Sequence, residues 1–166
     1  PHLSEYLRST FPTVDVHQAA LSDHAGTADF AYVHGPSEGW SGLKFRPLPS
    51  GEDVHVEQIE VKLEVLDDVL DPGRAPALIK IDVEGAEQQV IEGALATLRH
   101  HRPIVIFEHG AGSANHFGTE PADIHRLLCD DVGLRVFDLD GSGPYSLQEF
   151  ERAYYGGERV NFVARV

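Results

Sequence analysis

The chain of 166 residues has no methionine, one tryptophan and a single cysteine, Cys129. An internal disulfide needs two cysteines, so none can form, and we expect the protein to act in the cytoplasm. Basic residues are also scarce, because 13 Lys and Arg accompany 27 Asp and Glu and leave a net charge of −14. This balance argues against nucleic acid or an anionic membrane as a partner, since both attract basic surfaces.

Several diagnostic motifs are missing as well. No apolar run approaches the roughly 20 residues that cross a bilayer. No stretch matches a P-loop or a G-x-G-x-x-G turn. The length predicts one domain over residues 1–166. The opening "PHLSEYL" already has helical spacing, so we expect a piece of a longer chain; a complete protein that has lost its initiator methionine is the alternative.

Residue patterns predict an alternating order of strands and helices. Strands are expected over 14–23, 27–33, 59–65, 77–83, 104–108, 134–140 and 161–166. Helical segments are expected over 66–73, 86–101, 119–133 with Thr119 as N-cap, and 146–155, and a long loop over 35–53. A strand, a helix of a dozen residues and another strand form a parallel βαβ unit, so the pattern predicts an open α/β sheet.

Ligands of such sheets bind beyond the carboxyl ends of the strands. The residues at these ends are Ala20, Leu21 and Ser22, then Asp82, Val83 and Glu84, and then Glu108 and His109. We therefore expect these three groups to surround one site.

The stretch "KIDVEGAE" (80–87) has the highest density of polar groups at a strand end. Asp82 ends an apolar strand, where a lone buried charge would be costly, so it is a candidate ligand for a cationic or hydroxylated substrate. Glu84 and Glu87 have an alternative interpretation, in which they cap the following helix and offset its dipole.

The next strand ends in Glu108 and His109. Glu108 is a candidate general base, substrate anchor or metal ligand, and His109 a candidate base near neutral pH. The alternatives are a hydrogen bond from the loop backbone to Glu108 and a solvated position for His109. A divalent ion shared by Asp82, Glu84 and Glu108 is a further alternative.

Residues 138–149, "DLDGSGPYSLQE", resemble a calcium-binding EF-hand loop. An EF-hand needs a helix on each side, whereas residues 134–140 alternate as a strand. We therefore favour a turn after that strand, followed by a helix with Ser146 as N-cap and Glu149 completing a capping box.

Residues 77–108 closely resemble the signature of FkbM-type methyltransferases, which depend on S-adenosylmethionine. The pattern is K-x-D-x-E-G-x-E, a G-A pair in the helix, a proline, and a strand ending in glutamate. Here it is formed by Lys80, Asp82, Glu84, Gly85, Glu87, Gly93, Ala94, Pro103 and Glu108. "QAALSDHAGTADF" (18–30) and "LEVLDDVL" (63–70) are similar to two other segments of the family, so the resemblance covers nearly the whole chain.

The resemblance implies a Rossmann-like class I methyltransferase sheet of seven strands, mostly parallel with an antiparallel last strand. It also implies an N-terminal truncation, because the family's glycine-rich cofactor loop and ribose-binding acid lie upstream of everything here. Ala20, Leu21 and Ser22 would border the adenine of S-adenosylmethionine, and Asp82 would lie near its methionine end or the acceptor.

The same resemblance implies O-methylation of a hydroxyl on a small molecule or on a glycan-type or polyketide-type acceptor. Glu108 or His109 would orient or deprotonate that hydroxyl, and Glu84 would contact the acceptor. The loop with Trp40 and Ser41 would cover it, unless Trp40 fills the core instead. A truncated, non-catalytic binding module is the alternative function.

Overall fold

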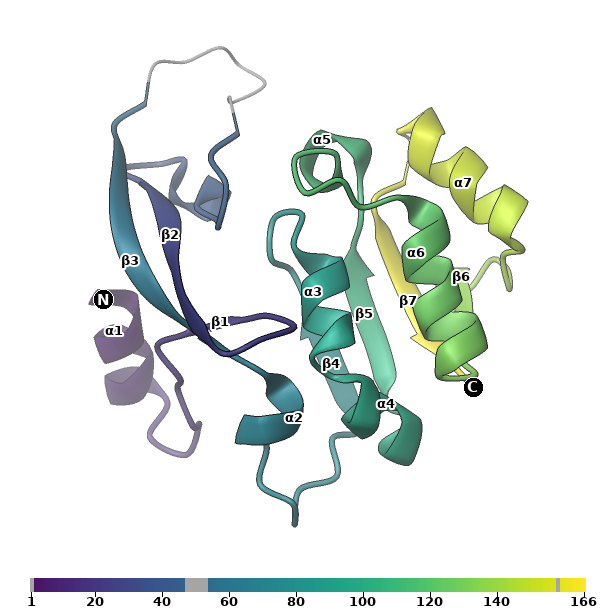
Figure 1. Cartoon of the computed structure of the whole chain (residues 1–166), viewed down its shortest axis with the longest axis horizontal. Coiled ribbons are helices and arrows are strands. Elements are labelled where there is room, and N and C mark those ends of the chain that lie inside the picture. Colours follow the sequence, from purple (N-terminus) through teal and green to yellow (C-terminus); the bar gives the residue numbers. More distant parts are fainter. Residues whose placement is uncertain (1, 47–53, 158) are drawn as a thin grey trace.

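The computed structural model describes residues 2–46, 54–157 and 159–166 (Figure 1). It contains two sheets, one of three strands in the order β1-β3-β2 and one of four strands in the order β4-β5-β7-β6. The seven strands therefore form two sheets and not the one continuous sheet that the resemblance implied. Within the described residues, β1 pairs only with β3 and β4 pairs only with β5, so each presents a free edge.

The first sheet consists of β1 (Ala20–Leu21), β2 (Gly26–Val33) and β3 (Val56–Glu64). Strand β1 is parallel to β3, and β2 is antiparallel to it. The alternation in β2 and β3 confirms the predicted strands there. The strand predicted over 14–23 is wrong in extent, because only two of its residues pair.

The second sheet consists of β4 (Leu78–Ile81), β5 (Ile104–Glu108), β6 (Arg135–Asp138) and β7 (Asn161–Arg165). Strand β4 is parallel to β5, whereas β7 is antiparallel to both β5 and β6. Strands β4, β5 and β6 therefore run in one direction and the last strand runs against them, which confirms the predicted arrangement of this part of the fold.

Short helices surround the sheets. They are α1 (His2–Thr10), the 3-10 turn η1 (Glu38–Trp40), α2 (Leu66–Val69), α3 (Glu87–Glu92), α4 (Leu95–His101), α5 (Ala111–Ala114), α6 (Pro121–His125), the π-helical turn η2 (Arg126–Asp131) and α7 (Leu147–Gly156). The main core lies between the second sheet and its helices, and includes Ile91, Leu98, Phe107, Leu128 and Phe150, all fully buried.

The helix predicted over 86–101 is interrupted between α3 and α4. A Cβ atom on Gly93 would lie 2.1 Å from the carbonyl oxygen of Ser22, so the end of β1 presses directly on this position. The Asp67 carboxylate accepts the N–H groups of Ala96 and Thr97, each at 2.8 Å, and so caps a new helix start. The break is therefore caused by tertiary contacts, which the helical periodicity of the segment cannot reveal.

The helix predicted over 119–133 also differs from the structure. Glu120, and not Thr119, is the N-cap, and the second half is π-helical. Gly133 ends the segment with a φ of 82°, a left-handed conformation that glycine adopts without strain. Among the described residues, no helix has both the length and the apolar character needed to span a membrane.

Candidate active site

Two of the three predicted strand ends meet in one cavity of about 500 Å³. We call it the strand-end cavity. Its lining includes Ala20 and Leu21 from β1, Asp82 and Glu84 from the segment after β4, and Ser41 from the loop after η1. As the rule that ligands bind beyond strand ends predicts, the cavity combines residues that lie more than sixty positions apart in the sequence.

Ser22 lies next to the cavity and is buried, with 3% of its surface exposed. Its N–H donates to the carbonyl oxygen of Glu64 at 2.8 Å, and its hydroxyl donates to Asp23 at 3.0 Å. Ser22 therefore fixes the end of β1, while Ala20 and Leu21 contribute surface to the cavity.

The loop after η1 forms the opposite wall and is held against β2 by hydrogen bonds. The Ser41 hydroxyl accepts the Val33 N–H at 2.9 Å and donates to the Glu38 carbonyl oxygen at 2.7 Å. Gly42 exchanges two backbone hydrogen bonds with Ala31, at 2.8 and 3.2 Å. The predicted loop over 35–53 is thus ordered next to the cavity through residue 46, and its part from 47 to 53 lies outside the described residues.

Arg46 connects this loop to the segment after β4, and no sequence pattern indicated it. Its guanidinium forms an ion pair with Glu84 and lies over the Trp40 ring, 4.7 Å from the ring centroid. Only 7% of the Arg46 side chain is exposed. Trp40 is half-buried and contacts Arg46, so it neither fills the main core nor lines the strand-end cavity directly.

Glu84 has an unusual backbone, with a φ of 58°, which costs a non-glycine residue about 1 kcal/mol. Burial raises the pKa of its carboxyl, Arg46 opposes that rise, and the negative charges of Glu108, Asp82 and Glu87 add to it. Glu84 is therefore held in a strained, partly desolvated position by its ion pair and does not act as a simple helix cap.

Asp82 lines the strand-end cavity but is not buried. Its carboxylate pairs with Lys80, and 44% of its side chain is exposed. The premise that a lone charge is buried here is wrong. Asp82 remains a candidate contact for a ligand, because it lines the cavity and its side chain is partly exposed.

Glu108 and His109 point in different directions, as neighbours on a strand do. Glu108 is half-buried, and its pKa is raised first by burial and then by the charges of Asp82 and Glu87, against the opposing charges of Lys80 and Arg46. His109 is 0% exposed and stacks on Tyr154 at 4.8 Å. The alternative of a solvated His109 is therefore wrong, and its ring lies in the core.

A family model for the methyltransferase FkbM domain matches residues 4–136, which is most of the chain. The chain belongs to the FkbM methyltransferase family. The resemblance of "KIDVEGAE" and of the segments around it to this family is confirmed, and the strand-end cavity contains residues from that motif and from the "AALS" segment.

The fold is similar to the crystal structure of methyltransferase FkbM from Methylobacillus flagellatus KT at 2.20 Å resolution. The TM-score is 0.52 at 13% sequence identity, and the match covers 99% of this chain and 32% of that one. This FkbM-family chain thus spans about a third of the length of that relative. A search of curated proteins gives no match.

Across residues 2–46, 54–157 and 159–166, no three His, Cys, Asp or Glu side chains are placed so that they could hold a metal ion. In the stretch that resembles an EF-hand, Arg159 pairs with both Asp138 and Asp140. Strand β6 leads into it, and Ser146 and Glu149 form the predicted capping box.

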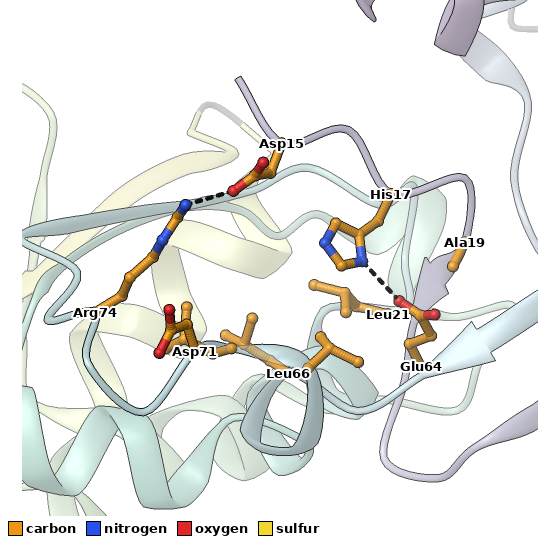
Figure 2. Close-up of a pocket in the computed structure, with 10 residues that line it drawn as sticks. Asp15, His17, Ala19, Leu21, Glu64, Leu66, Asp71 and Arg74 are labelled. Atoms are coloured by element: carbon orange, nitrogen blue, oxygen red, sulfur yellow. Dashed lines mark hydrogen bonds and ion pairs between the residues drawn. The ribbon is translucent and has the colours of Figure 1, made fainter. Parts of the chain in front are cut away.

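Two neighbouring hollows share the lining residue Leu21 with the strand-end cavity. One, of about 450 Å³, is bounded by the ion pairs of Asp15 with Arg74 and of His17 with Glu64 (Figure 2). The other is an apolar groove along the free edge of β4 that includes the exposed side chain of Leu78. The linings of the three hollows together include residues of β1 and of β4, and we call the three hollows the edge trough.

Proposed function

We propose that this chain forms part of an S-adenosylmethionine-dependent methyltransferase that methylates a hydroxyl on a small molecule or on a glycan-type or polyketide-type acceptor. Membership of the FkbM family supports the reaction class. The observation that carries the proposal is the strand-end cavity, because small apolar residues and two carboxylates line it together.

The residues present fit this cofactor. Ala20 and Leu21 offer the flat, apolar surface that an adenine ring requires. Asp82 and Glu84 are carboxylates that favour a nearby positive charge, and the cofactor has a cationic sulfonium and an amino group. When bound, S-adenosylmethionine supplies an electrophilic methyl group.

Glu108 is the residue that we assign as general base. An acceptor hydroxyl that receives the methyl group would lose its proton, and Glu108 would take up that proton. A carboxylate with a raised pKa takes up that proton more readily than an ordinary glutamate does. His109 lies in the core and is therefore not proposed as the base.

Ser41 and Glu84 are proposed to orient the acceptor, since both line the cavity opposite Ala20. Trp40 and Arg46 would support Glu84 from behind without touching the acceptor. The transfer needs a line of oxygen, carbon and sulfur, and two walls held by hydrogen bonds and an ion pair can align the reactants.

We further propose that protein outside these 166 residues completes the cofactor site at the edge trough. Two observations support this: the chain spans 32% of the M. flagellatus relative, and β1 and β4 each present an unpaired edge to the trough. The net charge of −14 supports a small-molecule acceptor and not nucleic acid or a membrane, and we keep action in the cytoplasm as a proposal.

The test is isothermal calorimetry of S-adenosylmethionine with the natural full-length protein. Asp82→Ala should weaken binding about tenfold or more, equivalent to about 1.4 kcal/mol. Asp130→Ala, which alters an exposed aspartate in η2 outside the cavity, is the matched control. Unchanged affinity in Asp82→Ala would remove Asp82 from the site.

A second variant separates binding from chemistry. Glu108→Gln should keep its affinity for S-adenosylmethionine and lower the rate of transfer roughly 100-fold or more, with any acceptor found by screening. A rate equal to that of the wild type would exclude Glu108 as the base. Wild-type protein that binds no S-adenosylmethionine would instead favour the non-catalytic binding module.

A further inference from the structure

Glu87 and His109 are an acid and a base buried side by side behind the strand-end cavity. Glu87 begins α3 and is 1% exposed, and His109 follows β5 and is 0% exposed. Glu87 Oε2 lies 3.7 Å from His109 Nδ1. Among the described residues, neither of these atoms has a hydrogen-bond partner, and His109 Nε2 has none either. Burying such groups without hydrogen-bond partners lowers the stability of the fold.

Each member of the pair is fastened to a different strand end. Glu87 Oε1 accepts the N–H of Gly85 at 2.8 Å, in the turn that follows β4. The His109 N–H donates to the carbonyl oxygen of Val160 at 2.7 Å, just before β7. The His109 ring stacks on Tyr154, whose hydroxyl donates to Asn115 at 2.9 Å.

The turn that Glu87 holds has little freedom to relax. Gly85 has a φ of 109°, and a Cβ atom there would lie 2.6 Å from the carbonyl oxygen of Ser113 in α5. The preceding residue, Glu84, has the left-handed backbone described above. Backbone in such conformations persists only where its surroundings hold it, and Glu87 supplies a hydrogen bond at this point.

We propose that Glu87 and His109 are a positioning pair that sets the turn carrying Glu84 relative to Glu108, and so fixes the spacing of the carboxylates on the two strand ends. Neither residue touches the cavity in this role. The inference rests on the proposed function only in taking these carboxylates to be the working groups, and its geometry does not depend on which reaction they serve.

The pair also influences its neighbours electrostatically. The charged groups that act on Glu108 are Asp82, Glu87, Lys80 and Arg46, and Glu87 is one of the two that raise its pKa. Removing the Glu87 charge without changing its shape should therefore lower the pKa of Glu108. A purely space-filling role for Glu87 would leave that pKa where it is.

The first measurement is a carbon-13 NMR titration of the glutamate carboxyl groups in the natural full-length protein, with Glu108 assigned by Glu108→Gln. Glu87→Gln should shift the Glu108 midpoint to lower pH. Glu92→Gln is the matched control, because Glu92 lies in the same helix and bonds only Gln88 in the part of the chain described. An unshifted midpoint in Glu87→Gln would overturn the electrostatic part of the proposal.

The second measurement is hydrogen exchange of the Gly85 amide, followed by mass spectrometry. His109→Ala should speed its exchange roughly tenfold, because Glu87 loses the group that faces it. His109→Asn should restore slow exchange, since its amide nitrogen takes the place of Nδ1. Equal exchange in all three proteins would overturn the positioning role.

These outcomes do not depend on methyl transfer. Protein that transfers no methyl group but shows both effects would keep the positioning pair and reject the proposed function. Protein that transfers methyl groups but shows neither effect would keep the proposed function and reject the positioning pair. If Glu87→Gln fails to fold, the comparison of His109→Ala with His109→Asn decides the matter, because it leaves Glu87 in place.

Discussion

Replacing Gly93 by alanine tests whether the end of β1 is rigidly packed against the break between α3 and α4. The backbone of Gly93 has a φ of −73° and a ψ of −2°, which alanine adopts without strain. On conformational grounds alone, the substitution should stabilise the fold by about 0.4–1 kcal/mol. Any loss of stability must therefore come from the contact of the new methyl group.

The size of that loss follows from the geometry. The new Cβ atom would lie 2.1 Å from the Ser22 oxygen and 3.0 Å from the Ser22 carbonyl carbon. A carbon–oxygen contact normally lies near 3.3 Å, so strand and helix must separate by about 1 Å. Such overpacking typically costs about 1–3 kcal/mol. After the conformational gain is subtracted, we expect a net loss of roughly 0–2.6 kcal/mol, centred near 1.3 kcal/mol. At that centre, Tm should fall by roughly 3–5 °C.

The assay is thermal unfolding followed by circular dichroism. Gly156→Ala is the matched control, because Gly156 ends α7 and a Cβ atom there would meet nothing within 4 Å. That control should unfold at the wild-type temperature or slightly above it. If Gly93→Ala has the same Tm as Gly156→Ala, the tight contact between Ser22 and the helix break is refuted.

Three further predictions concern other parts of the chain. Asp67→Ala should lower stability by about 1–2 kcal/mol in urea unfolding, because it uncaps α4, whereas Asp68→Ala, which alters the exposed neighbour, should not. The raised pKa of Glu108 contributes stability that is present below the ordinary value of 4.5 and is lost as pH rises through the raised pKa. Glu108→Gln should therefore flatten the fall in Tm over that interval, and an unchanged profile would contradict this. Millimolar calcium should leave Tm unchanged, and a calcium-dependent rise that disappears in Asp138→Ala would restore the EF-hand interpretation.

Local periodicity predicted most elements of the fold because their causes are local. Strands β2 and β3 alternate along their own length, and the helix start at Ser146 depends on a side chain three residues away. The break at Gly93 could not be predicted in this way. It depends on the carbonyl oxygen of Ser22, which is more than seventy residues away in the sequence.

The candidate site was predicted to a similar degree. The strand-end rule located Ala20, Leu21, Asp82 and Glu84, because it needs only strand ends and their direction. Arg46 was missed, since its partner Glu84 is 38 positions away and nothing in the loop sequence indicates a pair. His109 could have been placed better, because adjacent strand residues face opposite sides, so Glu108 and His109 could not both face the site. Neither of them lines the strand-end cavity.

Trp40, the single tryptophan of these 166 residues, is an intrinsic optical probe beside the candidate site. Trp40 stacks on Arg46, and Arg46 pairs with Glu84 at the wall of the strand-end cavity. A compound that draws Glu84 away from Arg46 changes the electric field at the indole. Its binding should therefore be visible as a change in intrinsic fluorescence, and acceptors can be screened by light emission alone, without labels and before any turnover is detected.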